Sequence, residues 1–178
     1  YDFLEYISKF IKDLGLCCEF EKFLMEVKYI QERNCLEEKI RTTFPVFKID
    51  KNNIISFDDS DNSYIYSIMQ LSTKTWIEIT YDDFLSILES LEWQAFTNKA
   101  ILYFTPCCLK YIFSNLSKFH LYGYVVDFLC IALRNQSTIF NTSQINLIID
   151  FLKLIQNFNQ EISVETHKKI TSTIQLYL

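Results

Sequence analysis

The scarcity of glycine and proline is the feature that most restricts how this chain can fold. Its 178 residues include only two glycines and two prolines. Glycine supplies the positive φ angles of tight turns and of phosphate-binding loops. Neither Gly15 nor Gly123 has a second glycine near it, so composition excludes a P-loop and a dinucleotide-binding fingerprint. An all-β sandwich, which places turn-forming residues at every hairpin, is disfavoured as well.

The apolar residues predict a mainly α protein. Hydrophobic residues make up 49% of the chain and aromatic residues 16%, a composition that fills a core and differs from that of disordered chains. We expect about seven helices in one compact domain of residues 1–178, with a small β hairpin near residues 46–57. Within this domain we distinguish an N-terminal helical pair (1–35), a core (36–158) and a C-terminal helix (163–178).

Helical spacing of apolar residues predicts three helices before the first proline. They run from Phe3 to Leu14, from about Cys18 to Arg33, and from Leu36 to Phe44, where Pro45 ends the last one. The predicted hairpin follows as the strands Val46–Asp50 and Ile54–Phe57 around the turn Lys51-Asn52-Asn53. The segment Tyr64–Leu71 fits either a helix or a strand, and we favour a helix.

Capping residues mark the helices of the second half. Thr80 and Asp83 form a capping box, and Thr97, Thr142 and Ser163 each open a further helix. Pro106 interrupts the helix that starts at Thr97, and we expect it to kink or split that helix. The segment Tyr124–Arg134 is almost wholly apolar, which indicates a helix at the centre of the fold.

Charge and hydropathy argue against nucleic acid and membranes as partners. The net charge is −5 with a pI near 5.1, and the longest basic cluster is the pair Lys168-Lys169. Phosphate binding requires clustered Lys and Arg. The most apolar run, Tyr122–Leu133, is too short to span a bilayer and contains Asp127. We therefore expect a soluble cytoplasmic protein; whether a leader precedes Tyr1 is left open, because the chain starts without a methionine.

The six cysteines indicate small buried hydrophobes in a reducing compartment. They occur as the vicinal pairs Cys17-Cys18 and Cys107-Cys108, together with Cys35 and Cys130. Adjacent cysteines rarely bridge each other, and a secreted disulfide framework is denser. Structural zinc needs Cys or His at spacings of two to four residues, which vicinal pairs do not offer. We expect no zinc site.

No pattern in the chain points to catalysis or to a cofactor. The only bases for a thiol nucleophile are His120 and His167, and no Cys-His signature surrounds either. A calcium loop beginning at Asp59 would carry Tyr64 where glycine is required and Gln70 where glutamate is required. The carboxylate pairs Asp82-Asp83 and Glu37-Glu38 lie in first helical turns, and Trp76 and Trp93 are expected in the core. We therefore predict no catalytic, cofactor-binding or metal-binding residue, and not an enzyme.

One stretch of the chain resembles a known type of sequence. In the run Phe96–Pro106, residues Thr97, Ala100, Tyr103 and Pro106 match a Thr-x-x-Ala-x-x-Tyr-x-x-Pro motif. With Trp76 and Ile79 before it and Phe140–Gln144 after it, the region of about residues 36–158 resembles an uncharacterised bacterial domain family. Asn98 and Leu102 stand where that family has proline and arginine. The family has no established activity, so the resemblance implies fold and bacterial origin and transfers no catalytic residue.

Three functions fit these observations. The first is a bacterial protein-interaction module, in its concrete form an immunity-type protein that neutralises a toxin through acidic contacts at Asp58, Asp59, Asp61 and Glu78. The second is a homo-oligomeric accessory or regulatory protein, such as a homodimer that shares the apolar helix Tyr124–Arg134. The third is an unrecognised enzyme that uses a thiol or a carboxylate.

Overall fold

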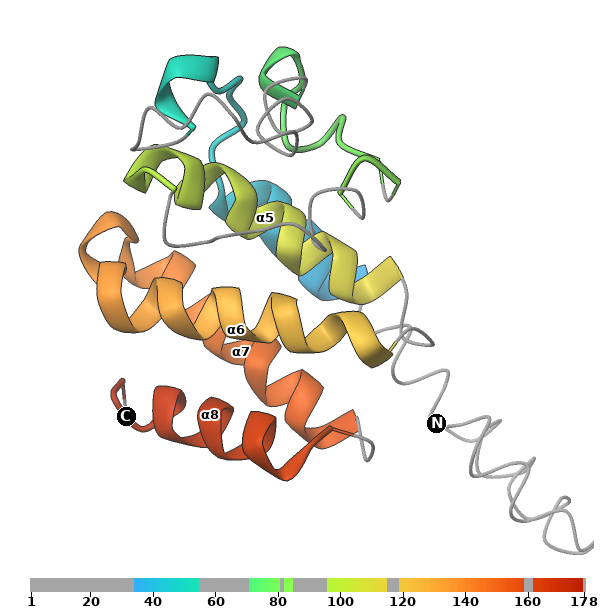
Figure 1. The fold of residues 1–178 in the computed structure, drawn as a ribbon, viewed down its shortest axis with the longest axis vertical. Coiled ribbons are helices and arrows are strands. Elements are labelled where there is room, and N and C mark those ends of the chain that lie inside the picture. Colours follow the sequence, from blue (N-terminus) through green and yellow to red (C-terminus); the bar gives the residue numbers. More distant parts are fainter. Residues whose placement is uncertain are drawn as a thin grey trace, which may run out of the picture. The chain divides into compact units, whose positions relative to one another are not determined.

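The structure is a computed structural model, and six stretches of the chain are described by it: residues 34–54, 71–80, 82–84, 96–114, 119–158 and 162–177. Backbone contacts divide the chain into two compact units, Tyr1–Glu38 and Lys39–Leu178. The second unit contains nearly all the described residues (Figure 1). The prediction of a single domain over residues 1–178 stays a prediction.

The described residues are mainly helical, as predicted from the helical spacing of the apolar residues. Four long helices follow one another in the second half: α5 (Asn98–Ser114), α6 (Phe119–Gln136), α7 (Thr142–Phe158) and α8 (Val164–Ile174). Short 3-10 helices lie at η1 (Lys51–Asn53), η2 (Leu71–Thr73) and η4 (Ser137–Ile139). Residues 34–43 and 82–84 are also helical. The two helices predicted before residue 34 lie outside the described residues, as does most of the segment Tyr64–Leu71.

The predicted β hairpin is absent from the described residues of its region. Lys48 pairs with Thr75 in an isolated antiparallel bridge, and Ile54 accepts a backbone hydrogen bond from Thr97. The residues assigned to the hairpin turn form η1, because the Asp50 carboxylate accepts a hydrogen bond from the Asn52 N–H at 2.8 Å. Lys48 and Ile54 thus pair with distant segments instead of with the opposite arm of a hairpin. The remainder of the second predicted strand, residues 55–57, lies outside the described residues.

Helix starts follow the predicted capping residues with one correction. Thr97 accepts the Ala100 N–H at 3.1 Å, and Ser163 accepts the Thr166 N–H at 3.1 Å. The helix α7 was expected to be capped by Thr142, but Asn141 is its cap. The Asn141 side chain accepts the Gln144 N–H, and the Gln144 side chain accepts the Asn141 N–H, both at 3.0 Å. Asn141 is the cap because its side-chain oxygen lies three residues before Gln144 and accepts the Gln144 N–H, which completes a reciprocal capping box.

Pro106 does not split α5, which runs continuously through it. Proline has no N–H to donate to the carbonyl of Leu102 one turn earlier. The neighbouring Thr105 hydroxyl bonds back to the Ile101 carbonyl at 2.7 Å, and Thr105 is fully buried. Packing on the buried side of α5 thus holds a helix that the local sequence alone favours breaking.

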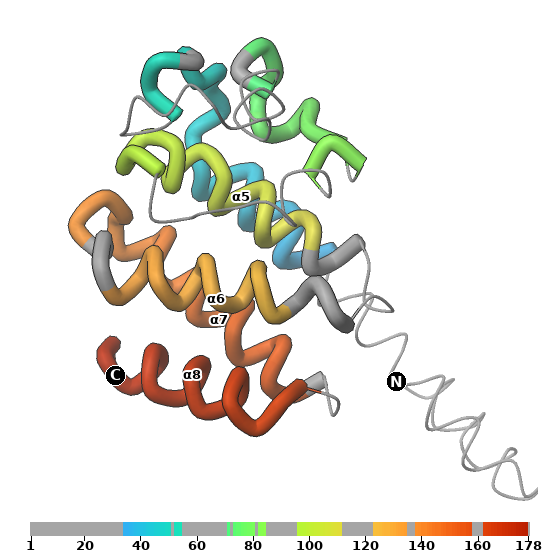
Figure 2. The backbone as a smooth tube through the Cα atoms, viewed as in Figure 1, coloured from blue at the N-terminus to red at the C-terminus, as the bar shows by residue number. Residues whose placement is uncertain are grey.

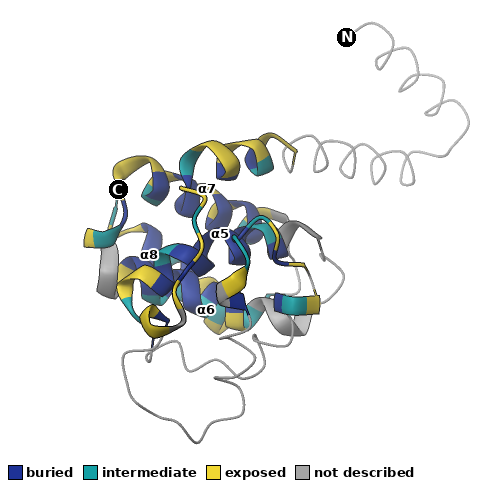
Figure 3. Ribbon diagram, turned by 90° about the horizontal axis from the view of Figure 1, so that it is seen from above, coloured by how far each residue is buried: buried dark blue, intermediate teal, exposed yellow. Residues whose placement is uncertain are grey.

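The core of the unit Lys39–Leu178 lies among α5, α6 and α7. Its largest fully buried side chains include Tyr103, Phe104, Phe128 and Phe151. Within the unit, α6 lies between α5 and α8 and also contacts α7 (Figures 1 and 2). The expectation that Tyr124–Arg134 forms a central helix is therefore confirmed. Buried residues gather on the inward faces of these helices, and exposed residues follow their outer faces (Figure 3).

None of the described helices is both long enough and apolar enough to cross a membrane.

Candidate functional site

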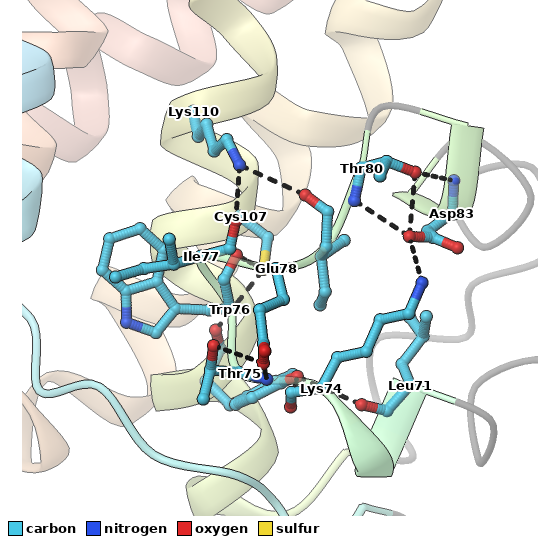
Figure 4. A network of polar contacts seen from close by, with 12 residues as sticks. Leu71, Lys74, Thr75, Trp76, Ile77, Glu78, Thr80, Asp83, Cys107 and Lys110 are labelled. Atoms are coloured by element: carbon cyan, nitrogen blue, oxygen red, sulfur yellow. Dashed lines mark hydrogen bonds and ion pairs between the residues drawn. The ribbon is translucent and has the colours of Figure 1, made fainter.

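Residues 71–80, which we call the anchored segment, have little regular structure and lie against α5 (Figure 4). Beyond η2 and one bridge residue, their backbone groups have no helix or strand to pair with. Buried backbone groups without partners are costly, so such a segment needs polar side chains from elsewhere. In this molecule those side chains come from one face of α5.

Three side chains of α5 donate to the carbonyls of the anchored segment. Tyr103, Cys107 and Lys110 are spaced four and three residues apart, so they lie on one face of the helix. The Tyr103 hydroxyl donates to the carbonyls of Lys74 at 2.6 Å and Leu71 at 3.3 Å. The Cys107 thiol is a weak donor with one hydrogen, which it can share between the Trp76 carbonyl at 3.9 Å and the Tyr103 carbonyl of its own helix at 3.7 Å, so its contribution to the anchoring is small.

The third donor, Lys110, makes the strongest of these contacts. Its ammonium donates to the carbonyls of Ile77 at 2.9 Å and Ile79 at 3.2 Å. A hydrogen bond from a charged donor stabilises by about 1.5–3 kcal/mol. The order of donors along α5 matches the order of acceptors along the anchored segment. Side chains of the helix thus supply hydrogen bonds that the backbone of a neighbouring strand would otherwise donate.

Two carboxylates, Glu78 within the anchored segment and Asp83 just after it, each close a turn. Glu78 accepts the Thr75 N–H at 2.7 Å and the Thr75 hydroxyl at 2.8 Å. Asp83 accepts the Thr80 N–H at 2.9 Å, while the Asp83 N–H donates to the Thr80 hydroxyl at 3.2 Å. The predicted capping box is therefore confirmed. Lys74 adds an ion pair to the Asp83 carboxylate at 2.6 Å.

Both carboxylates are held in their ionised form by these contacts. Hydrogen bonds from the Thr75 backbone and hydroxyl lower the pKa of Glu78, and the nearby lysines Lys48 and Lys74 lower it further. Burial acts to raise the pKa of Asp83. The hydrogen bonds from Lys74 and Thr80 outweigh burial, so that the pKa lies below its ordinary value.

The thiols are unsuited to nucleophilic catalysis wherever the structure describes them as buried. Burial raises the pKa of Cys107, of Cys108 and of Cys130, so each stays protonated near neutral pH. The four described cysteines are free, and these three are buried as predicted. Cys35 is exposed, contrary to the expectation of burial, because it lies on the outer face of the helical residues 34–43. Cys17 and Cys18 lie outside the described residues.

The described histidine and the described metal-ligand residues form no catalytic or metal-binding arrangement. His167 is exposed on α8, where its Nδ1 lies 3.3 Å from Nε2 of Gln156. The side chain of His120 lies outside the described residues, although α6 includes its backbone. Within the described stretches, no group of three or more His, Cys, Asp or Glu residues is placed to hold a metal ion.

Of the four predicted partner contacts, only Glu78 lies in the described part of the chain. It is exposed and closes the Thr75 turn. Asp58, Asp59 and Asp61 lie outside the described residues. Sequence reasoning did not single out Lys110, although a lone lysine inside the apolar run of α5 is a signal that could have drawn attention to it.

Two further predictions concern aromatic residues and the central helix. Trp76 is buried, and its indole N–H donates to the Pro45 carbonyl at 3.0 Å, so its expected place in the core is confirmed. Trp93 lies outside the described residues. In the segment Tyr124–Arg134, most apolar residues are buried within this chain, whereas Tyr124 is 52% exposed.

The motif residues of Phe96–Pro106 have physical roles in this fold. Thr97 caps α5, Ala100 and Tyr103 are fully buried, and Pro106 lies within the helix. A scan of protein-family models, a search of curated proteins and a search of solved structures found no match to this chain. The resemblance to a bacterial family stays a prediction.

Proposed function

We propose that this protein is a protein-interaction module and that the anchored segment, with Glu78, is part of its binding surface. The observation that supports the proposal most is the set of donors on α5. Tyr103 and Lys110 hold an irregular, partly exposed segment in one conformation from a rigid helix. Binding residues concentrate on loops that a scaffold positions in this way.

The anchoring favours binding because it holds residues 71–80 in one conformation before a partner arrives. A segment that is already ordered loses little conformational entropy when a partner docks. The exposed members of the segment include Thr73, Glu78 and Thr80, which are polar or charged. Such a surface suits a polar interface rim with direct hydrogen bonds.

The chemistry of the described residues favours binding over catalysis. The buried thiols are protonated, and the carboxylates of Glu78 and Asp83 are hydrogen-bonded to backbone N–H groups of their own turns. An ionised carboxylate at the surface attracts a partner of positive potential. A basic protein, for example a toxin with a cationic substrate cleft, is the partner class that we propose, in line with the acidic charge of the chain.

The test is co-expression of the full chain with the product of the gene next to its own, followed by calorimetric titration of the purified pair. We expect Glu78→Arg to weaken binding about tenfold or more, because it reverses a charge at the interface. Asp150→Arg makes the same charge change at an exposed position of α7 and serves as the matched control. Equal affinities of the two variants, or no binding to a neighbour that is also harmless to cells, would overturn the proposal.

Lys110→Met tests the role of anchoring itself. The variant keeps the length and apolar stem of the side chain while removing the donor to Ile77 and Ile79. We expect faster amide hydrogen exchange in residues 71–80, weaker partner binding and unchanged helical circular dichroism. Unchanged exchange in these residues would show that Lys110 does not position the segment.

A further inference from the structure

The C-terminal helix α8 is attached to the rest of its unit with little apolar burial. Its buried residues are Ile170, Thr173 and Ile174, of which one is polar and none is aromatic. The neighbouring α7 has more than twice as many buried apolar residues, namely Leu147, Ile148, Ile149, Phe151, Leu152, Leu154 and Ile155. Apolar burial is the main force that holds packed helices together, and the side chains of α8 itself contribute less of it than those of α7.

Polar side chains at the edge of the contact make up most of the remaining attachment to α6. Lys169 forms an ion pair with Asp127, and both side chains are about a third exposed, at 32% and 41%. The Arg134 guanidinium donates to the Thr173 hydroxyl at 2.9 Å and to the Lys169 carbonyl at 3.2 Å, and it also reaches the Ser172 hydroxyl. Partly exposed ion pairs are weak and are screened by salt.

The contacts of α8 with α7 are similar in kind. Gln156 of α7 donates to the Thr171 hydroxyl at 2.8 Å and lies 3.3 Å from Nδ1 of His167. Beyond the helix end, the Tyr177 hydroxyl donates to the Leu133 carbonyl of α6. Water can replace each of these hydrogen bonds when the helix moves away.

The helix is also complete in itself. Ser163 caps its first turn by accepting the Thr166 N–H, and Gln175 and Leu176 close its last turn onto Thr171 and Thr173. In the described part of the chain, no backbone hydrogen bond joins residues 163–177 to another element. α8 can therefore separate as an intact helix without leaving orphaned backbone groups.

A single thiol lies beneath this helix. Cys130 of α6 is only 1% exposed. Burial raises the pKa of its thiol, and Thr173 of α8, which is fully buried, is among the groups that act to lower that pKa. Cys107 and Cys108 lie on α5, whose neighbour in the fold is α6 (Figure 1). Of the three buried cysteines in the described stretches, Cys130 thus reports on α8, and Cys107 and Cys108 report on the core.

We propose that α8 is a detachable helix, which opens as a unit while α5, α6 and α7 stay folded and thereby uncovers the face of α6 that contains Cys130. Local openings of this kind occur in elements with few buried apolar contacts and many exposed polar ones. The polar contacts at Asp127, Arg134 and Gln156 set how often the helix opens. Access to this face of α6 is controlled by the same contacts.

The experiment is thiol labelling of the native protein with a maleimide, followed by peptide mass spectrometry. We expect Cys130 to react faster than Cys107 and Cys108 in the absence of denaturant. Lys169→Met and added salt should each raise the Cys130 rate about threefold, since both remove the ion pair, and should leave the Cys107 and Cys108 rates unchanged. Asp150→Asn, an exposed carboxylate on α7, is the matched control and should change no rate.

Two outcomes would overturn the proposal. In the first, Cys130 reacts only as fast as Cys107 and Cys108, so that global unfolding exposes all three thiols together. In the second, Lys169→Met raises all three rates alike, which means that the variant destabilises the whole unit. Amide hydrogen exchange provides an independent readout, with exchange in α8 faster than in α7 if the helix opens alone.

Discussion

At the scale of single residues, the partly buried carboxylate of Asp83 stabilises a turn and the start of a helix. Its side chain accepts hydrogen bonds from the Thr80 backbone and hydroxyl and pairs with Lys74. These contacts require the ionised form, which is why the pKa of Asp83 is lowered in spite of partial burial. The same logic applies to Glu78 and Thr75. The ionised carboxylates of Glu78 and Asp83 thus both help to hold the backbone of the anchored segment in place.

This lowered pKa predicts a pH dependence of stability. Because the folded-state pKa lies below that of an unfolded aspartate, about 4, the carboxylate stabilises the fold above that pH. The contribution is lost as the pH falls through the folded-state pKa. We expect Asp83→Asn to lower the free energy of unfolding by about 0.5–1 kcal/mol at pH 7 and by much less at a pH below the folded-state pKa, as measured by urea titration.

The matched control for this prediction is the neighbouring exposed carboxylate. Asp82→Asn removes a negative charge from the same helical turn. If Asp82→Asn and Asp83→Asn show the same dependence on pH, the contacts of Asp83 with Lys74 and Thr80 are not the source of the effect.

At the scale of secondary-structure elements, the start of α7 depends on a reciprocal cap. Asn141 and Gln144 exchange two hydrogen bonds, and Gln144 also donates to the Thr43 carbonyl at 3.3 Å. The cap thereby ties the first turn of α7 to the end of the helical residues 34–43. Gln144 thus takes part both in the local cap of α7 and in a hydrogen bond to Thr43, about a hundred residues earlier in the chain.

The two candidate capping residues of α7 can be separated by mutation. We expect Asn141→Ala to destabilise the protein by about 1 kcal/mol, because it leaves the Gln144 N–H without its acceptor. Thr142→Ala, at the exposed next position, should stay within about 0.5 kcal/mol of the parent. Denaturant titrations of both variants measure the difference. Equal losses would contradict the assignment of Asn141 as the cap.

At the scale of the whole molecule, most of the buried apolar side chains of the unit Lys39–Leu178 lie on α5, α6 and α7. Phe128, Phe151 and Leu152 are buried to 1% exposure or less on α6 and α7. Such interiors are close-packed, so a side chain removed from them leaves a cavity that the surroundings fill only in part.

Leu152→Ala tests this assignment of the core. We expect a loss of about 2–5 kcal/mol in the free energy of unfolding, the range found for large-to-small substitutions at fully buried sites. Lys153→Ala, one residue further along α7 and exposed, should change it by about 0.5 kcal/mol or less. Thermal unfolding followed by circular dichroism compares the two. Similar melting temperatures would place Leu152 outside the core.

The sequence by itself determined the helical class and most helix starts. Thr97, Ser163 and the Thr80–Asp83 box act on N–H groups within three residues, so their roles depend on neighbours that the sequence displays directly. The burial of Trp76 and of the Tyr124–Arg134 segment followed from the apolar pattern in the same way.

Only the tertiary structure decided where distant partners meet. Among the described residues of the predicted hairpin, Lys48 pairs with Thr75 and Ile54 with Thr97, while the residues of the expected turn form a 3-10 helix that the Asp50 carboxylate stabilises. Pro106 stays inside a continuous α5 because the buried surroundings of that helix outweigh one lost hydrogen bond. The aim of Lys110 at two carbonyls more than thirty residues away is likewise a property of packing, since no local pattern records which backbone groups a helix face will meet.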